Sequence, residues 1–247
     1  MKQVAVIVGG MGAVGQATAR VLGRSGYQVV IVHRNTSTEA IASCMETLPT
    51  DTRFFQCDVR SSADVARTVQ GIIERHKRID VCIYTAADQI LRKRLLDMSE
   101  QEFRGQFEAS LFGACTIFRH VAPHMREQKS GTLIGITSSV IDDATTSARM
   151  HAYAVAKIAL RGLLREFHRE LAGSGVRVLD VVPEFMDTKM HADVPARFVE
   201  MVRRQHPQQR LMLPEDVANA IRELLLGAHQ GLDGVTYRVA SNTYTTL

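Results

Sequence analysis

The sequence predicts a three-layer α/β fold, with an open, doubly wound parallel sheet of about seven strands and helices on both faces. Short apolar runs alternate with segments of helical periodicity along all 247 residues. The apolar runs are nearly all continuous, which is typical of parallel strands buried on both faces. Because crossovers between parallel strands are right-handed, such β-α units wind into one open sheet.

The strands are expected at the apolar runs and the helices between them. The predicted strands are Val4–Val8, Gln28–Val32, Arg53–Gln56, Asp80–Tyr84, Thr132–Thr137, Arg177–Val182 and Val235–Val239. The predicted helices are approximately Ala13–Ser25, Thr38–Leu48, Ser62–His76, Gln101–Arg126, Met150–Ala172 and Pro214–Leu226. Ser99 and Glu102 form a capping-box signature, and Pro214 favours a helix start.

We expect a single domain, residues 1–247, because no Pro/Ser-rich linker, repeat or low-complexity segment interrupts the β-α pattern. The stretch 189–213 carries no strand pattern and is the candidate for a mobile lid over the site. Hydrophobic residues make up 45% of the chain, which is enough for a sizeable core. The N-terminal apolar run is too short for a signal sequence or a membrane span, so a cytoplasmic protein is expected.

Composition also narrows the classes of partner. The formal net charge is only +4, and the longest basic run, 92–94, lacks the interleaved aromatic residues of a nucleic-acid binder. The four cysteines contain no Cys-x-x-Cys pair, and the histidines show no metal-ligand spacing. We therefore expect no nucleic acid, no disulfide and no metal site.

A glycine-rich turn follows the first predicted strand and leads into a helix. It reads Gly9-Gly10-Met11-Gly12-Ala13-Val14-Gly15. Glycines let the backbone turn tightly and approach a pyrophosphate, and the helix N-terminus presents free N–H groups to the anion. In this strand–turn–helix setting the motif predicts a Rossmann-like dinucleotide site, the alternative being a merely tight turn.

The end of the second predicted strand favours NADP(H) over NAD(H). NAD-binding folds of this kind place a carboxylate there to hold the ribose 2′-hydroxyl. This chain has His33-Arg34-Asn35 instead, with no carboxylate. Arg34 could make charge-assisted hydrogen bonds to a 2′-phosphate, although it could also be a solvated surface charge.

Tyr153 and Lys157 form the candidate catalytic pair. Their i, i+4 spacing places both on one face of a predicted helix, where the ammonium would lower the pKa of the phenol. Such a phenol could protonate a ketone or accept a proton from an alcohol. Ser138 ends a predicted strand at the ligand-binding edge of the sheet and could hydrogen-bond the substrate oxygen. The alternative for the pair is an ordinary turn of an amphipathic helix.

Taken together, these motifs resemble the short-chain dehydrogenase/reductase family over essentially the whole chain. Further landmarks are Cys57-Asp58-Val59, Ile79-Asp80-Val81, Pro123-His124-Met125, Val182-Pro183 with Thr188, and Pro214-Glu215-Asp216-Val217-Ala218. The resemblance implies that Tyr153 is the general acid/base and that Lys157 also binds the nicotinamide ribose. It implies that Ser138, or alternatively Ser139, orients the carbonyl, and that the protein is a homodimer or homotetramer joined through its helices 101–126 and 150–172.

The resemblance also implies the cofactor contacts. Asp58 and Val59 would contact adenine, Ala86 and Ala87 the ribose, and Thr188 the nicotinamide carboxamide. The full set expected to bind NADP(H) is Gly9, Met11, Gly12, Val14, Gly15, His33, Arg34, Asn35, Asp58, Val59, Ala86, Ala87, Tyr153, Lys157, Pro183 and Thr188.

The sequence departs from the family pattern near the catalytic residues. The family's Asn-Asn-Ala-Gly motif corresponds to Thr85-Ala86-Ala87-Asp88, and its Pro-Gly pair to Pro183-Glu184. Its helical asparagine, which supports a proton relay, falls at Ser110, which we count with the catalytic set. Four carboxylates, Asp88, Asp142, Asp143 and Glu184, follow the fourth to sixth strands. They would favour a polar or cationic substrate if they faced the site rather than solvent.

These inferences predict an NADPH-dependent ketoreductase that reduces a carbonyl to a secondary alcohol, with Tyr153 as general acid. The first alternative is an NAD(P)⁺-dependent alcohol dehydrogenase. The second is a non-catalytic NADP(H)-binding sensor or partner subunit, against which the retention of Tyr153 and Lys157 argues. The substrate would be a small carbonyl or alcohol compound, and the basic loop at 92–94 could receive one that is linked to an acidic carrier protein.

Overall fold

A computed structural model of the chain describes residues 2–142, 149–186, 188, 194, 196–205 and 209–247. The strands are β1 (Val4–Val8), β2 (Gln28–His33), β3 (Arg53–Gln56), β4 (Val81–Tyr84), β5 (Gly131–Ile136), β6 (Val176–Val182), β7 (Val235–Arg238) and β8 (Thr243–Thr246). The α-helices are α1 (Ala13–Arg24), α2 (Thr38–Met45), α3 (Ser62–His76), α4 (Glu100–Phe107), α5 (Ala114–Gln128), α6 (His151–Leu171), α7 (Ala196–Gln205) and α8 (Pro214–Leu226). Two 3₁₀ turns, η1 (Leu95–Asp97) and η3 (Ser139–Ile141), and a π-helical turn, η2 (Glu108–Gly113), complete the set of described elements.

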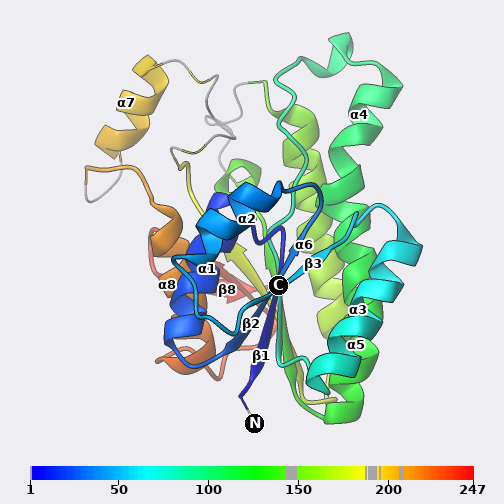
Figure 1. Cartoon of the computed structure of the whole chain (residues 1–247). Coiled ribbons are helices and arrows are strands. Elements are labelled where there is room, and N and C mark those ends of the chain that lie inside the picture. The colour runs from blue at the N-terminus through cyan, green and yellow to red at the C-terminus, as the bar shows by residue number, and fades with distance from the viewer. Residues whose placement is uncertain (1, 143–148, 187, 189–193, 195, 206–208) are drawn as a thin grey trace.

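The strands form one sheet in the order β3-β2-β1-β4-β5-β6-β7-β8 (Figure 1). All neighbours are parallel except β7 and β8, which are antiparallel. The chain starts at β1 in the interior of the sheet, winds outward to β3, and then returns to β4 on the other side of β1. Connections therefore leave β1 and β4 in opposite directions, and ligands of open α/β sheets bind at the carboxyl ends of such a strand pair.

Alternate residues of each central strand pack against different helical layers, as the two-residue period of a strand requires. On β1, Val6 belongs to a core that includes residues of α3, α5 and α6. Its neighbour Ile7 belongs to a second core with α1 and α8. Figure 1 shows these two helical layers on opposite sides of the sheet, so the predicted three-layer, doubly wound fold is confirmed.

Three elements differ from the prediction. The helix expected over 101–126 is divided by the π-helical turn η2 into α4 and α5. Strand β8 was not predicted, because its sequence Thr-Tyr-Thr-Thr is exposed along its whole length and has no apolar run. Helix α7 lies inside the segment 189–213 that was expected to form a lid, and parts of that segment lie outside the described residues.

The local predictions at two helix starts are confirmed. The Ser99 hydroxyl accepts a hydrogen bond from the Glu102 amide at 3.2 Å, and the Glu102 carboxylate accepts one from the Ser99 amide at 2.7 Å. Pro214 occupies the first turn of α8. All four cysteines are free thiols.

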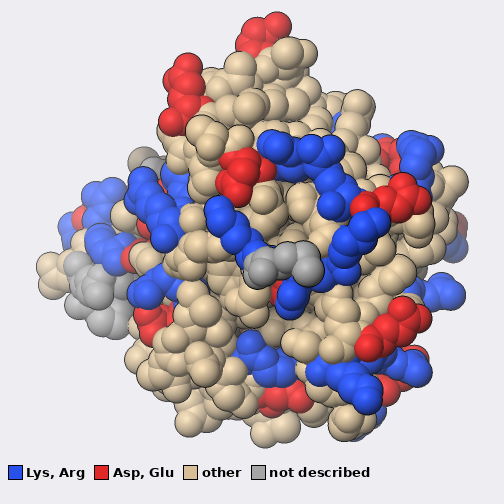
Figure 2. All heavy atoms as spheres, turned by 60° about the horizontal axis from the view of Figure 1, so that its bottom comes forward, with Lys and Arg blue, Asp and Glu red and all other residues tan. Residues whose placement is uncertain are grey.

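Basic side chains gather on the face where the strands begin and most helices end (Figure 2). The last turns of α1, α3, α5 and α6 each carry an arginine. A cation at a helix C-terminus is stabilised by the partial negative charge of the terminal carbonyls. These helix-terminal arginines account for part of the basic character of this face. None of the described helices is long and apolar enough to cross a membrane.

Candidate active site

The glycine turn between β1 and α1 closes tightly on itself. Gly9 has a φ of +79°, and the Gly12 amide donates to the Gly9 carbonyl at 2.9 Å. A Cβ on Gly15 would lie 2.6 Å from the Cα of Gly10, so only glycine fits at this packed position. Helix α1 begins at Ala13, directly after Gly12, and no side chain caps it there. The N–H groups of its first turn are therefore left for an anion. The turn therefore fits the pyrophosphate of a dinucleotide.

A cavity of about 560 Å³ runs from this turn along the carboxyl edge of the sheet to the start of α6. It brings together much of the predicted site, namely Met11, Gly12, Val14, Gly15, Ala87, Ser138, Tyr153, Lys157, Pro183 and Thr188. Residues of the wall that the sequence did not single out as functional include Thr85, Val140, Met150, Phe185, Met186 and Phe198. Most of these are apolar, and an apolar wall cannot be distinguished from core packing in a sequence.

Several predicted cofactor residues lie outside this cavity, beside the glycine turn. His33 ends β2, and Arg34 and Asn35 follow it; the Cys57 amide, directly after β3, donates a 2.8 Å hydrogen bond to the His33 carbonyl. His33 is buried with an unpartnered Nδ1, whereas Arg34 and Asn35 are exposed. The Asp58 carboxylate instead binds the Arg60 guanidinium of its own loop.

The other predicted site residues that lie outside the cavity are packed against neighbouring parts of the fold. Val59 packs beneath Gly113, where a Cβ would lie 2.7 Å from its side chain. Gly9 approaches the backbone of Ala86 so closely that a Cβ would lie 2.6 Å from the Ala86 nitrogen. Ser110 is fully buried in η2. The close approach of Gly9 to Ala86 places the first β-α turn directly against the end of β4.

Tyr153 lies in the first turn of α6 with only 7% of its surface exposed. Burial raises the pKa of its phenol to about 12, and a hydrogen bond from Ser138 opposes this shift. The lowered pKa predicted from the Tyr-x-x-x-Lys spacing is therefore wrong in this structure. The spacing shows that the lysine is near, but it does not show how completely the neighbours remove the phenol from water.

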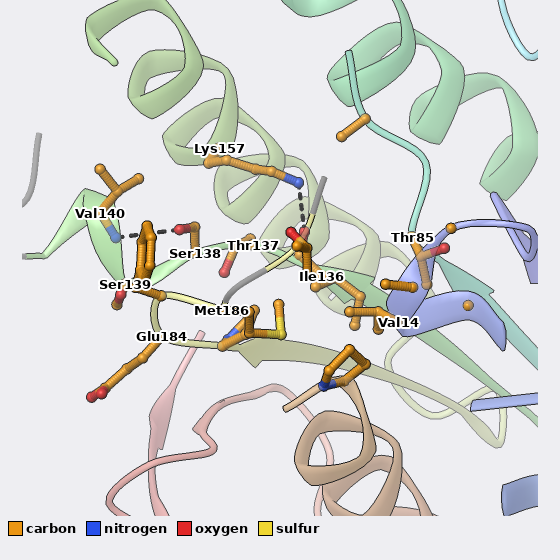
Figure 3. A pocket seen from close by; sticks show the side chains of 18 of the residues that line it. Val14, Thr85, Ile136, Thr137, Ser138, Ser139, Val140, Lys157, Glu184 and Met186 are labelled. Atoms are coloured by element: carbon orange, nitrogen blue, oxygen red, sulfur yellow. Dashed lines mark hydrogen bonds between the residues drawn. The ribbon is translucent and has the colours of Figure 1, made fainter. Parts of the chain in front are cut away.

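Lys157 lies one turn further along α6 and is also buried. Its Nζ donates a 2.8 Å hydrogen bond to the Ile136 carbonyl, as Figure 3 shows, and lies 5.6 Å from the centre of the Tyr153 ring. Burial lowers the pKa of Lys157 to about 8, and the carboxylates of Asp180 and Asp88 oppose this shift. The predicted proximity of the two side chains is thus confirmed.

The structure distinguishes the two candidate serines. Ser138 caps η3 by accepting a 3.4 Å hydrogen bond from the Val140 amide (Figure 3), and its hydroxyl acts on the phenol of Tyr153, where it opposes the rise in pKa. Ser139 lines the same cavity, and its amide donates to the Pro183 carbonyl at 3.0 Å. The link to the phenol favours Ser138 as the partner of a substrate oxygen.

Ser110 is held by Asp88 rather than directed at the cavity. One oxygen of Asp88 accepts hydrogen bonds from the amides of Ala109 and Ser110 and from the Ser110 hydroxyl, at 2.9, 3.0 and 3.1 Å. The Asp88 amide donates back to the Ser110 hydroxyl at 3.2 Å. The pair therefore ties the loop after β4 to the π-helical turn, directly behind the end of that strand.

The described carboxylates among these four do not gather toward the cavity to favour a cationic substrate. Asp88 binds η2, and Asp142 binds Arg161 at 2.9 Å and Arg238 at 2.5 Å. Glu184 lines the cavity, but its carboxylate points away from Ser138 and Lys157 in Figure 3. Asp143 lies outside the described residues. Two of the four carboxylates are therefore engaged by arginines or amides of the chain itself.

Sequence reasoning missed one buried charged pair close to this cavity. Asp180 in β6 is fully buried and accepts a 2.9 Å hydrogen bond from Nε of Arg161, which lies one turn after Lys157 on α6. An aspartate between apolar neighbours of a predicted strand is the available signal, because buried carboxylates require a partner. Among the described residues, no group of three or more His, Cys, Asp or Glu side chains could hold a metal ion.

Comparison with known proteins gives consistent relatives. A family model described as enoyl-(acyl carrier protein) reductase matches residues 10–240. A 3-oxoacyl-[acyl-carrier-protein] reductase of Synechocystis is 30% identical, covering 90% of this chain and 88% of its own. The cis-4-hydroxycyclohexanecarboxylate dehydrogenase of Sinomonas cyclohexanicum is 28% identical over 94% of this chain and 96% of its own.

A solved structure supports the fold. The crystal structure of gox2181 matches 96% of this chain and 95% of its own with a TM-score of 0.87. Its sequence is 23% identical, so this likeness establishes the architecture alone.

Proposed function

Because the chain belongs to the short-chain dehydrogenase/reductase family of NAD(P)(H)-binding oxidoreductases that act on CH–OH or C=O groups, we propose that it is a cytoplasmic, NADPH-dependent ketoreductase. It would reduce a carbonyl to a secondary alcohol, with Tyr153 as general acid. The observation that carries this proposal is the shared cavity, in which the phenol of Tyr153 and the hydroxyl of Ser138 lie on one wall and the glycine turn forms another.

The chemistry follows from the protonation states of the side chains. A bound nicotinamide cofactor would supply the hydride to the carbonyl carbon. With its pKa raised to about 12, the Tyr153 phenol stays protonated at neutral pH and is available to donate its proton to the developing alkoxide. Ser138 would donate a hydrogen bond to the same oxygen, and hydrogen bonds aimed at developing charge stabilise the transition state. Lys157 would place a positive charge beneath the phenol.

NADP(H) is the proposed cofactor because of the residues at the end of β2. No carboxylate is present there to repel a 2′-phosphate, and the side chain of Arg34 is exposed. The positive charge of Arg34 is near enough to contribute to the lowered pKa of Asp58, to about 2, of which the hydrogen bond from Arg60 is the largest cause. Arg34 and the buried His33 would together receive the phosphate.

The substrate proposed is a small, largely apolar ketone or acyl chain. The cavity that holds Tyr153 is also lined by Val140, Met150, Phe185 and Phe198. Two cationic side chains that line the cavity already have partners within the protein. The ammonium of Lys157 is hydrogen-bonded to Ile136, and Arg20 is paired with Glu215 at 2.9 Å. A carrier-linked substrate is supported by the names of two relatives, both 3-oxoacyl-[acyl-carrier-protein] reductases.

The segment 189–213 is proposed to act as a lid on a single catalytic domain. Within its described residues, Phe198 of α7 lines the cavity, and its ring lies 5.6 Å from that of Phe185 in a T-shaped arrangement. Figure 1 shows α7 above the carboxyl edge of the sheet, on the side opposite α4. Movement of α7 would therefore change access to the substrate end of the cavity.

The purified protein should oxidise NADPH in the presence of a panel of ketones, measured at 340 nm, and NADH more slowly. Tyr153→Phe keeps the ring and removes the proton donor, so its turnover should fall at least a hundredfold while NADPH binding, measured by fluorescence, is retained. Comparable rates in both proteins would refute the ketoreductase. Initial rates with the corresponding alcohols and NADP⁺ or NAD⁺ test the oxidative direction.

A further inference from the structure

A buried aspartate lies behind the active site, between apolar residues of β6. Asp180 is fully buried in β6, flanked by Leu179 and Val181, which are also fully buried. An unpaired carboxylate in such a place would be strongly destabilising, because burial removes its hydration. Neighbouring groups must therefore stabilise the Asp180 carboxylate.

Three side chains from three elements satisfy the Asp180 carboxylate. The Thr137 hydroxyl donates to Oδ1 at 2.6 Å, and the Thr236 hydroxyl of β7 donates to Oδ2 at 3.1 Å. Nε of Arg161 on α6 also donates to Oδ2, at 2.9 Å. The carboxylate thus links the residue that follows β5, the strand β7 on the other side of β6, and the helix that carries Tyr153 and Lys157.

Two of these three ties, those to Thr137 and Arg161, end beside a proposed catalytic side chain. Thr137 directly precedes Ser138, and the carbonyl of the preceding residue, Ile136, accepts the hydrogen bond from Lys157. Arg161 lies one helical turn after Lys157, on the same face of α6. The Arg161 guanidinium continues to Asp142 at the end of η3, through bonds of 2.9 and 3.2 Å. Asp180 is therefore linked to the chain on both sides of Ser138.

We propose that Asp180 is a positioning residue of the active site, which fixes Ser138 through Thr137, fixes α6 through Arg161, and balances the charge of Lys157. This inference rests on the proposed function for its effect on turnover. Asp180 touches neither the cavity nor the phenol, so its action passes through these neighbours. Its effect on Lys157 can be measured without any substrate.

The described charged and titratable groups around Lys157 set the expected sign. On α6 these are Tyr153 and Arg161, on β6 Asp180, and in the loop after β4 Asp88. Burial lowers the pKa of Lys157 to about 8, and the negative charges of Asp180 and Asp88 both oppose that shift. Asp180→Asn preserves the shape of the side chain and removes its charge, so the pKa of Lys157 should fall further. The ammonium would then be lost at a lower pH.

Asp180→Asn should lower kcat roughly tenfold, because loss of a charge-assisted hydrogen bond loosens Ser138 and α6. The alkaline limb of the kcat–pH profile should move to lower pH, by about one unit. Asp80→Asn is the matched control. Asp80 is a nearly buried carboxylate bound by Arg78 at 2.8 and 2.5 Å, but it lies at the opposite edge of the sheet. This control should lose stability and keep the alkaline limb in place.

A direct titration separates this inference from the ketoreductase proposal. The ¹³C signal of the Lys157 ε-methylene, assigned by its absence in Lys157→Arg, should titrate near pH 8 in the native protein and lower in Asp180→Asn. An unchanged midpoint would overturn the role of Asp180 in balancing Lys157, whether or not any ketone is reduced. A native protein that reduces no ketone would instead refute the proposed function and leave this titration valid.

Thr137→Val tests the positioning role in a protein that keeps the carboxylate. It removes the bond to Asp180 Oδ1 and should lower kcat while the alkaline limb stays near its native position. If Asp180→Asn does not fold, Thr137→Val still tests whether the link from Asp180 to Ser138 affects turnover. A Thr137→Val protein with native kcat would overturn the link from Asp180 to Ser138.

Discussion

Two adjacent serines line the cavity, and their relation to the phenol distinguishes them. Because Ser138 opposes the rise in the pKa of Tyr153 and would share the substrate oxygen with it, Ser138→Ala should lower kcat by about two to three orders of magnitude, as loss of a donor to developing charge does. Ser139→Ala is the matched control and should stay within a few-fold of the native enzyme. Steady-state kinetics with one ketone tests both, and the reverse ranking would assign the role to Ser139.

The sequence predicted which proposed catalytic side chains share the cavity, but not their electrostatics. Tyr153, Lys157 and Ser138 were predicted from spacing and from position at a strand end, and the structure brings all three to one cavity. The direction of the pKa shift at Tyr153 was wrong because it depends on burial by Ile90, Val140 and Met150, which pack around it. Pairwise spacing carries no information about that enclosure.

Between α4 and α5 the chain forms a π-helical turn that is held by a distant carboxylate. A π-turn leaves backbone groups out of the regular helical ladder, and Asp88 accepts hydrogen bonds from the amides of Ala109 and Ser110. From the other side, the Tyr84 hydroxyl donates to the Ala109 carbonyl. The turn is therefore specified by residues that precede it by about twenty positions, and the local helical periodicity of 101–126 could not predict it.

Asp88→Ala should destabilise the protein by about 1–3 kcal/mol, because two buried amides and the Ser110 hydroxyl lose their acceptor. The free energy of unfolding in urea measures the loss, and amide hydrogen exchange should rise most within η2. Asp97→Ala removes an exposed carboxylate from the same connection, in η1, and should change stability by less than about 0.5 kcal/mol. Equal stability of the two variants would show that Asp88 does not hold the π-turn.

At the scale of the whole molecule, the sequence predicted the arrangement of the strands more completely than the features of the protein surface. Continuous apolar runs predicted seven parallel strands, and the glycine turn predicted which strand end carries the site. The edge strand β8 escaped prediction because exposed threonines leave no apolar signal. The basic face in Figure 2 likewise arises in part from helix ends that meet only in the folded protein.

The surface of α6 and η2 suggests how copies of the chain associate. Ile158 and Phe112 are each 53% exposed and Val155 is 39% exposed, although all three are large and apolar. Val155 and Ile158 are three residues apart and share a face of α6, whose opposite face is buried on the sheet. Apolar side chains that remain exposed on neighbouring elements are typical of an interaction surface.

We therefore expect a homodimer or homotetramer that buries this surface, and Ile158→Asp should dissociate it, because the interface would have to desolvate a carboxylate with no partner. Multi-angle light scattering on a size-exclusion column gives the mass directly. Met45→Asp is the matched control, since Met45 is 47% exposed on α2, which packs on the opposite face of the sheet. A native protein that elutes with the mass of one chain, or an Ile158→Asp variant that keeps the native mass, would contradict this interface.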